Sequence, residues 1–354
     1  MKQTTAVAIS GGVDSLMSAY LIKEQGQHVV GIHFITGFEI PSFSAQHPGT
    51  NKNNILEIGE QLEIPVEIVD IRSEFKEKIV DYFSRTYQSG RTPNPCMQCN
   101  PVIKFGTILD HALKLGARKL ATGHYARIKE DQNGKYHLLK GLDPKKDQSY
   151  FLARLTQRQL AKACFPLGKL KKEDVKKMAA RKGLHPVTRA ESQDVCFIKH
   201  NAYGDFLTRQ IGLEIKPGLI ENMQGKVIGK HKGLHLFTIG QRRGINCPAA
   251  EPYYVVRLDT ERNRLIVGSK NNLLRTECKI TDVNWIDVEP GSPVDVYTRV
   301  RYHSKEVPSA VFPQDEHTAI VRFKRPQSAV TPGQGAVFYQ GDEILGGGWI
   351  SPEG

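Results

Sequence analysis

The sequence has few cysteines and no long apolar run. Its 354 residues include six cysteines, too few for a disulfide framework in a chain of this length. No stretch approaches the ~18 consecutive apolar residues of a membrane-spanning helix, and the first residues do not form a signal-peptide pattern. Internal repeats and low-complexity tracts are absent as well. We therefore expect a cytoplasmic protein without a membrane partner, whose cysteines are catalytic, metal-binding or simply buried.

Acidic residues are outnumbered, and most of the imbalance falls in one segment. The chain has 49 Lys and Arg against 37 Asp and Glu, and residues 129–190 alone hold sixteen Lys and Arg but six Asp and Glu. Clustered cations neutralise phosphates and release their counterions, so this segment is a candidate nucleic-acid surface. The alternative interpretation is a set of solvated helix faces on a basic protein.

Composition and length predict a globular protein of two or three domains, because 354 residues exceed one ordinary core. The first part of the chain alternates short apolar strands with helical patterns, which indicates an α/β fold with a parallel sheet covered on both faces. The expected strands are Ala6 to Ser10, Val29 to Phe34, Val66 to Asp70 and Lys119 to Thr122, and the expected helices are Leu16 to Gln25, Asn54 to Leu62, Phe75 to Tyr87 and Phe105 to Leu115.

The later sequence is rich in strands. A basic helix is expected from Leu170 to Lys182, and from about Tyr203 onward Gly-rich turns separate short β-like runs. Short strands at this spacing indicate a small barrel or sandwich. The expected strands are Tyr253 to Leu258, Arg264 to Val267, Ile280 to Trp285, Val294 to Arg301, Ala319 to Phe323, Gly335 to Tyr339 and Glu343 to Ile350.

A glycine turn lies between the first strand and the first helix. It consists of Ser10, Gly11, Gly12, Val13, Asp14 and Ser15. Such a turn lets the backbone approach an anion, and the positive end of the following helix stabilises negative charge. No lysine follows the second glycine, so this is not a Walker A loop. It resembles the PP-loop of the ATP pyrophosphatases, which implies cleavage of ATP to AMP and pyrophosphate and activation of a carbonyl oxygen as an adenylate.

Two further segments carry thiols. Prolines at positions 93 and 95 are expected to exclude regular helix or strand, so that Cys96 and Cys99 lie on a stiff extended loop. A third thiol, Cys196, follows Ser192-Gln193-Asp194. The remaining cysteines are expected to be packing residues, namely Cys164, Cys247 and Cys278.

The segment from Phe38 to Asn53 reads as a loop on the side of the phosphate turn, where it could cover ATP.

Together these segments resemble the tRNA-specific 2-thiouridylases over nearly the whole chain. The matching motifs are Ser10 to Ser15, Gly90-Arg91-Thr92-Pro93-Asn94-Pro95 with Cys99-Asn100, Ala121 to Arg127, Lys146 to Phe151, Ser192 to Phe197, Phe237 to Gly244 and Gly346-Gly347-Gly348. The resemblance implies a PP-loop domain over residues 1–202, a small central domain over 203–275 and a C-terminal β-barrel over 276–354. It also implies replacement of the C2 oxygen of the wobble uridine (U34) by sulfur in tRNAs for Lys, Glu and Gln.

The resemblance also assigns site residues. It implies ATP contacts by Ala8, Ile9, Ser10, Gly11, Gly12, Val13, Asp14, Ser15, Phe34 and Gly123. Mg²⁺ would offset the triphosphate charge beside Asp14, whose alternative role is hydrogen bonding within the turn. It implies tRNA contacts by Lys146, Asp147, Gln148, Arg301 and Tyr302, and contacts with the target base by Asn94, Pro95 and Cys96. Cys196 would carry a persulfide from a sulfur-donor protein, Cys99 would complete the transfer, and a disulfide between them would follow. Phe34 reads equally well as a core aromatic, and Arg301 and Tyr302 as an exposed strand pair.

One position departs from the family pattern. The family has Asn-Pro-Asp where this chain has Asn94-Pro95-Cys96, so the carboxylate usually credited with acid and base catalysis is missing. Cys96, Cys99 and Cys196 could together bind a 4Fe-4S cluster, as three cysteines do in related PP-loop tRNA thiolases. A metal-free persulfide relay, a zinc site and an inert pair of cysteines remain open alternatives.

Other classes of protein share parts of this pattern. PP-loops also serve ATP-dependent ligases and amidotransferases, but those enzymes do not explain paired thiols beside an Asn-Pro turn. A non-catalytic RNA-binding protein would have no use for an intact phosphate turn.

Overall fold

The computed structural model describes residues 3–38, 50–187, 195–198, 203–248, 251–287 and 290–352, apart from the side chains of 50–54 and 209–210. Most of the expected loop from Phe38 to Asn53 and the segment Ser192 to Asp194 lie outside these residues. Among the helices that can be described, none is long and apolar enough to cross a membrane.

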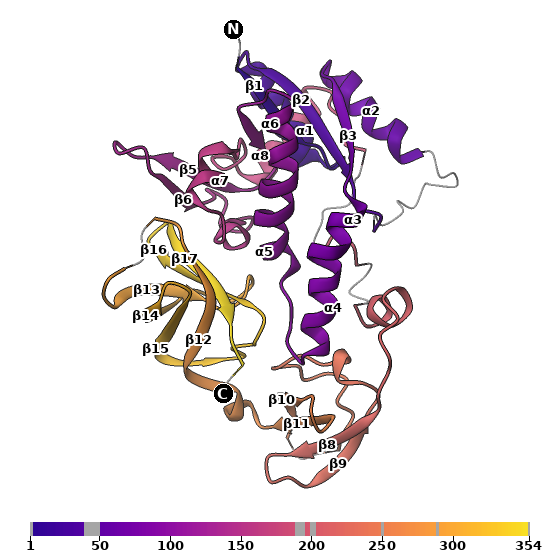
Figure 1. The fold of residues 1–354 in the computed structure, drawn as a ribbon, viewed down its shortest axis with the longest axis vertical. Helices are drawn as coiled ribbons and strands as arrows, with labels where there is room; N and C mark the ends of the chain where they lie inside the picture. Colours follow the sequence, from indigo (N-terminus) through magenta and orange to yellow (C-terminus); the bar gives the residue numbers. More distant parts are fainter. Residues whose placement is uncertain are drawn as a thin grey trace.

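The first sheet is parallel, as the alternating pattern predicts, and has the order β3-β2-β1-β4-β7 (Figure 1). Its strands are β1 Thr4–Ala8, β2 His28–Ile35, β3 Val66–Asp70, β4 Lys119–Ala121 and β7 Ala163–Cys164. Side chains of β1 alternate between two cores. Val7 packs with residues of α1 Val13–Glu24, α2 Thr50–Leu62 and α8 Lys172–Arg181, whereas Ala6 packs on the opposite face. That opposite face is covered by residues of two long, irregular helical segments.

Each irregular segment contains a π-helical insertion. The first comprises α3 Arg72–Phe75, η1 Lys76–Val80 and α4 Asp81–Gln88, and the second α5 Pro95–Cys99, η2 Asn100–Ile108 and α6 Leu109–Lys114. The expectation of an extended loop around Cys96 and Cys99 is therefore wrong, because the helix begins at Pro95. Asn94 caps it by accepting a hydrogen bond from the Met97 backbone at 3.1 Å, and proline is favourable in the first helical turn.

The middle part of the chain contains a separate four-stranded sheet with the order β10-β11-β8-β9. Its strands are β8 Gly218–Asn222, β9 Val227–His231, β10 Tyr254–Asp259 and β11 Arg264–Gly268, and its short helices are α9 Tyr203–Asp205, η4 Phe206–Gln210, η5 Leu234–Leu236 and η6 Lys270–Leu273. A small core that includes Ile220, Phe237 and Val255 holds this part together.

The last part of the chain is a closed barrel, as expected. Six strands are joined in the order β12-β15-β14-β13-β16-β17, and a further pairing of β12 with β17 closes the ring. They are β12 Leu274–Trp285, β13 Val294–Arg299, β14 Val307–Asp315, β15 Thr318–Ser328, β16 Gly335–Gln340 and β17 Glu343–Ile350. The sequence patterns did not indicate β14.

A hairpin of the first domain extends the barrel sheet. Strands β5 Ala126–Glu130 and β6 Tyr136–Lys140 form an antiparallel pair, and Leu138 of β6 lies opposite Ile344 of β17. Ion pairs surround this junction: Arg127 with Asp342 at 2.7 Å, Lys140 with Glu306 at 2.8 Å and His137 with Glu343 at 2.6 Å. The first domain and the barrel are therefore joined by a continuous ladder. The remaining described helices are η3 Ser149–Leu152 and α7 Gln157–Lys162.

Candidate active site

The phosphate loop, residues 10–15, lies at the carboxyl end of β1, where parallel sheets bind their ligands. Gly11 has a φ of +87°, which favours glycine, and Gly12 precedes the first turn of α1 in an extended conformation. The Ser15 hydroxyl donates to the Gly12 carbonyl at 2.9 Å and accepts from the Ser10 backbone at 3.2 Å. No side chain caps α1. Its first backbone N–H groups are therefore available to an anion.

Gly123 lies directly against this loop. A Cβ atom at position 123 would be 2.8 Å from Asp14 Cβ and 3.1 Å from the Ser15 backbone nitrogen. Such distances leave no room for any side chain, so the close approach of the strand β4 exit to the phosphate loop requires glycine.

Asp14 has two strong partners. Tyr125 donates its hydroxyl hydrogen to Asp14 Oδ1 at 2.8 Å, and Lys172 Nζ lies 2.7 Å from Oδ1 and 2.6 Å from Oδ2. The Lys172 side chain is only 8% exposed, while Asp14 is 34% exposed. Sequence analysis missed Lys172, because nothing but its place in a basic helix singled it out.

The other predicted nucleotide contacts lie at the same edge of the sheet. Ala8 and Ile9 are only 9% and 1% exposed, and the backbone of Ile9 is hydrogen-bonded to Ile32 and His33, so both residues lie beneath the site rather than open to it. Phe34 lies near the carboxyl end of β2, opposite Val69 in register, and is partly buried against the first-domain core. The alternative interpretation of Phe34 as a core aromatic therefore has structural support.

Cys96 lies in the first turn of α5, and Cys99 is the last residue of that helix. Burial raises the pKa of each to about 12, a nearby Cys196 adds to the increase, and the Lys104 cation opposes it. Cys196 itself is exposed. The three predicted thiols are thus near enough that charge on Cys196 raises the pKa of both Cys96 and Cys99.

No disulfide joins any of the six cysteines, all of which lie in the described residues. Within those residues no group of three or more His, Cys, Asp or Glu side chains is arranged as a metal site.

Lys104 and His124 connect the thiols to the phosphate loop. Lys104 donates from Nζ to His124 Nε2 at 3.4 Å, and His124 Nδ1 lies 2.7 Å from Thr122 Oγ1. Burial and the Lys104 cation hold the pKa of His124 well below its usual value, so the imidazole is neutral near pH 7. Residues 122–125 therefore contact the phosphate loop through Gly123 and Tyr125 and the thiol region through His124.

The predicted tRNA segment 146–148 is partly internal. Asp147 is 5% exposed, and its Oδ1 accepts from the backbones of Gly141 at 3.0 Å and Ser149 at 3.1 Å. Gln148 Oε1 accepts from the Tyr125 backbone at 3.0 Å. Asp147 and Gln148 thus hold the segment in place, and Lys146 is partly exposed beside them.

Arg301 and Tyr302 lie in a turn after β13, because that strand ends at Arg299 rather than at Arg301. The Tyr302 ring is 4.4 Å from that of Phe151 in the first domain. Burial raises the pKa of Tyr302, and negative charge on Asp147 and Cys96 adds to the increase. The barrel therefore borders the thiol region.

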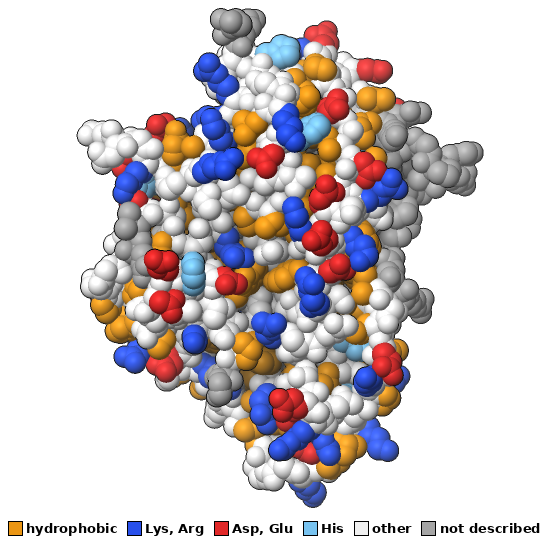
Figure 2. Space-filling model, in the orientation of Figure 1, with side chains coloured by type: hydrophobic (Ala, Val, Ile, Leu, Met, Phe, Trp, Pro, Cys, Tyr) orange, Lys and Arg blue, Asp and Glu red, His pale blue; other side chains and the backbone are white. Residues whose placement is uncertain are grey.

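Basic residues do not gather in one patch on the face in view. Figure 2 shows Lys and Arg side chains interspersed with Asp and Glu. Some of the excess cations of segment 129–190 are paired with carboxylates of the same chain: Lys135 lies 2.5 Å from Asp287, and Lys140 and Lys172 are also in ion pairs.

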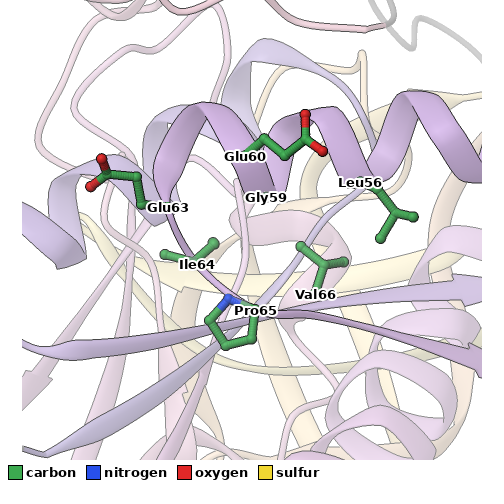
Figure 3. A pocket seen from close by; sticks show the side chains of 7 residues that line it. All are labelled: Leu56, Gly59, Glu60, Glu63, Ile64, Pro65 and Val66. Atoms are coloured by element: carbon green, nitrogen blue, oxygen red, sulfur yellow. The ribbon is translucent and has the colours of Figure 1, made fainter.

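A surface pocket lies away from this site. It is lined by Leu56, Gly59, Glu60, Glu63, Ile64, Pro65 and Val66 (Figure 3). These residues lie at the amino end of β3, whereas the phosphate loop follows the carboxyl end of β1, so the pocket is on the opposite edge of the sheet.

Comparison with known proteins identifies relatives along the whole chain. Residues 3–200 match the model of the tRNA methyl transferase HUP domain, residues 204–269 the tRNA methyl transferase PRC-barrel domain, and residues 275–350 the aminomethyltransferase beta-barrel domain. A solved structure of NMN synthetase from Francisella tularensis has a TM-score of 0.34 at 11% identity over 61% of this chain and 79% of its own, too remote to bear on function.

The curated relatives are much closer. The tRNA-specific 2-thiouridylase MnmA of Desulfosudis oleivorans is 49% identical over 98% of this chain and 95% of its own. Those of Syntrophotalea carbinolica and Geobacter metallireducens are 44% and 43% identical, over 98% and 99% of this chain and 97% of each relative. With this identity over almost its entire length, the chain belongs to the family of the tRNA-specific 2-thiouridylases.

Proposed function

We propose that this protein is a tRNA-uridine 2-sulfurtransferase that adenylates O2 of the wobble uridine with ATP and replaces that oxygen by sulfur. The observation that carries the proposal is the position of residues 122–125 between the phosphate loop and the thiols. Gly123 lies against Asp14, while His124 contacts Lys104 beside Cys96 and Cys99. Adenylation and sulfur transfer can therefore act on one bound base.

The first step forms the adenylate. Uridine O2 attacks the α-phosphorus, the bond to the β-phosphate oxygen breaks, pyrophosphate leaves, and the N3 proton is released. The phosphate loop and the first turn of α1 would hold the phosphates. Mg²⁺ would offset their charge, with Asp14 as its candidate carboxylate ligand.

The second step delivers sulfur. A persulfide on Cys196 attacks C2 and AMP leaves, so that C2 is joined to Cys196 through two sulfurs. The Cys99 thiol gives up its proton as its sulfur attacks Cys196 Sγ, which breaks the sulfur-sulfur bond and leaves the terminal sulfur on C2, and N3 takes up a proton. A Cys99–Cys196 disulfide results, which an external thiol must reduce. The exposure of Cys196 supports loading by a sulfur-donor protein.

For substrate binding we propose that Lys146, Arg301 and Tyr302 contact tRNA, and that Asn94, Pro95 and Cys96 border the target base. Asp147 and Gln148 act by holding the segment that carries Lys146. The substrates would be tRNAs for Lys, Glu and Gln. The proposed domain limits are 1–202, 203–275 and 276–354.

A second candidate for the sulfur carrier is a 4Fe-4S cluster held by Cys96, Cys99 and Cys196. It is favoured by the cysteine at position 96, although the three thiols are not arranged as a metal site in the described part of the chain. Thiolate ligands suit such a cluster, and one iron without a protein ligand would offer a place for sulfide. Anaerobic purification followed by iron and acid-labile sulfide analysis tests this candidate, and a colourless, fully active enzyme would exclude it.

The central test measures tRNA nucleosides by mass spectrometry in a strain that lacks the gene. Loss of 2-thiouridine at position 34, restored by the intact gene, is the expected result. Release of AMP without any change in 2-thiouridine would instead favour a PP-loop ligase or amidotransferase.

A further inference from the structure

The phosphate loop contains no cation of its own. A Walker A loop places a lysine after its last glycine, whereas this loop continues with Val13 and Asp14. Asp14 adds a negative charge beside the position expected for a triphosphate. An ATP site of this kind needs positive charge from elsewhere in the chain, in addition to Mg²⁺.

Lys172 supplies such a charge from a distant part of the sequence. Its Nζ atom lies within 2.7 Å of both carboxylate oxygens of Asp14, and its side chain is 8% exposed. An ammonium group is seldom buried to this extent unless it is paired with an anion. The side chain is therefore fixed at the phosphate loop rather than free in solvent.

The fold holds Lys172 there by two attachments. The Lys172 backbone N–H, at the start of α8, donates to Asp143 Oδ2 at 3.0 Å. One turn further along, Val175 packs in the same core as Leu16 of α1. Both the first turn of α8 and the first turn of α1 thus converge on Asp14.

We propose that Lys172 binds the β- and γ-phosphates of ATP, exchanging Asp14 for phosphate oxygens when the nucleotide enters. Asp14 is the more exposed partner and can turn to Mg²⁺, while the ammonium hydrogens become available to the phosphates. When the bond to the α-phosphorus breaks, Lys172 stabilises the negative charge that develops on the pyrophosphate. The inference rests on the proposed function insofar as it assumes that the loop binds ATP.

A purely structural ion pair predicts a different result. If Lys172 only holds Asp14 in place, its loss disturbs the whole loop and lowers the affinity for all adenine nucleotides alike. If Lys172 binds the terminal phosphates, its loss lowers the affinity for ligands that contain those phosphates and leaves the affinity for AMP unchanged.

The experiment measures binding by calorimetry without tRNA, using Mg²⁺ with α,β-methylene-ATP, pyrophosphate or AMP. For K172Q we expect affinity for the first two ligands to fall about ten- to a hundredfold, the effect of one charged hydrogen-bonding group, and AMP affinity to stay within about twofold. K177Q, which removes an exposed lysine from the same helix, is the matched control and should bind like wild type. Equal pyrophosphate affinity of K172Q and wild type, or a parallel loss of AMP, would overturn the proposal.

A second pair of variants controls for a loop that misfolds because Asp14 has lost its partner. K172Q leaves the Asp14 carboxylate without its cation, whereas D14N and D14N/K172Q both lack that carboxylate and differ only in the Lys172 charge. K172Q should still lower pyrophosphate affinity in the D14N background, and no difference between these two proteins would contradict the proposal. Absence of tRNA-dependent AMP release by wild type would contradict the proposed function instead, so the two failures are distinguishable.

Discussion

Tyr302 of the barrel packs against Phe151 of the first domain, with their ring centroids 4.4 Å apart and the rings inclined by 36°. This contact lies next to Cys96, since charge on that thiol raises the pKa of Tyr302. A barrel residue and a first-domain residue thus form one wall beside the thiols. An aromatic wall at this place suits a base that has left its stack.

Replacement of Tyr302 tests the wall. Y302A should raise the KM for tRNA severalfold, because a stacking surface is lost. Y302F keeps the ring and should therefore keep the wild-type KM. Steady-state thiolation with varied tRNA measures the effect. Y297A is the control, since Tyr297 is a half-exposed tyrosine on β13 of the same barrel. Equal KM values for Y302A and Y297A would show that the Tyr302 ring does not contact the substrate.

Gly123 should not tolerate even a methyl group. In G123A the new Cβ must displace the Asp14 segment from 2.8 Å, and overpacking of this kind costs about 1–3 kcal/mol. We expect weaker binding of Mg-ATP, measured by calorimetry. G291A is the control, because a Cβ at Gly291 meets no atom within 4 Å. If G123A bound Mg-ATP as tightly as wild type, the close approach of position 123 to Asp14 would be unimportant for nucleotide binding.

The thiols should differ in reactivity. With pKa values raised to about 12 by burial, Cys96 and Cys99 are protonated at pH 8, whereas Cys196 is exposed. Iodoacetamide should therefore modify Cys196 first, as followed by peptide mass spectrometry of the protein without substrates. Faster modification of Cys99 than of Cys196 would contradict the burial of its thiol.

Sulfur transfer should depend on both relay thiols. C99S and C196S should abolish 2-thiouridine formation while tRNA affinity stays within about twofold, since neither change removes a phosphate contact. C278S, at a buried barrel position, is the control and should retain thiolation. Full sulfur transfer by C196S would show that the two-thiol scheme is wrong.

Protonated His137 should stabilise the junction between the first domain and the barrel in mild acid. The Glu343 hydrogen bond raises the pKa of His137, and Asp131 contributes as well. A raised folded-state pKa means that this stability is fully present below about pH 6.5, the usual unfolded value, and is lost as the pH rises through the folded value. Urea unfolding of wild type and H137N should therefore differ most in acid, and a difference that grows with pH would contradict this assignment.

Regular parts of the fold could be predicted from the sequence. Val66–Asp70 was expected at its observed bounds because its apolar pattern is local, and the barrel was expected from its short, regularly spaced strands. Pro95 was misread because the same ring that breaks a helix interior fits the first helical turn, and Asn94 decides between the two. The Asn94 cap, rather than Pro95 itself, indicates that a helix begins here.

Contacts between distant segments could not be predicted in this way. Lys172 reaches Asp14 across 158 positions, and both of its neighbours in sequence, Lys171 and Glu173, are exposed. Strand β6 pairs with β17 across a gap of more than 200 positions, and its run Tyr136–Lys140 is too short to show a partner. One sequence contains no covariation, so such pairings appear only in the folded chain.

The ladder between β6 and β17 limits how the protein can be dissected. A fragment that ends before the barrel would uncover Leu138, which is fully buried in the intact chain, together with the backbone edge of β6. An uncovered apolar strand edge recruits other chains and promotes aggregation. Truncated proteins would therefore report on aggregation rather than on the role of a missing domain. The contribution of each domain has to be measured by point substitutions in the full-length chain.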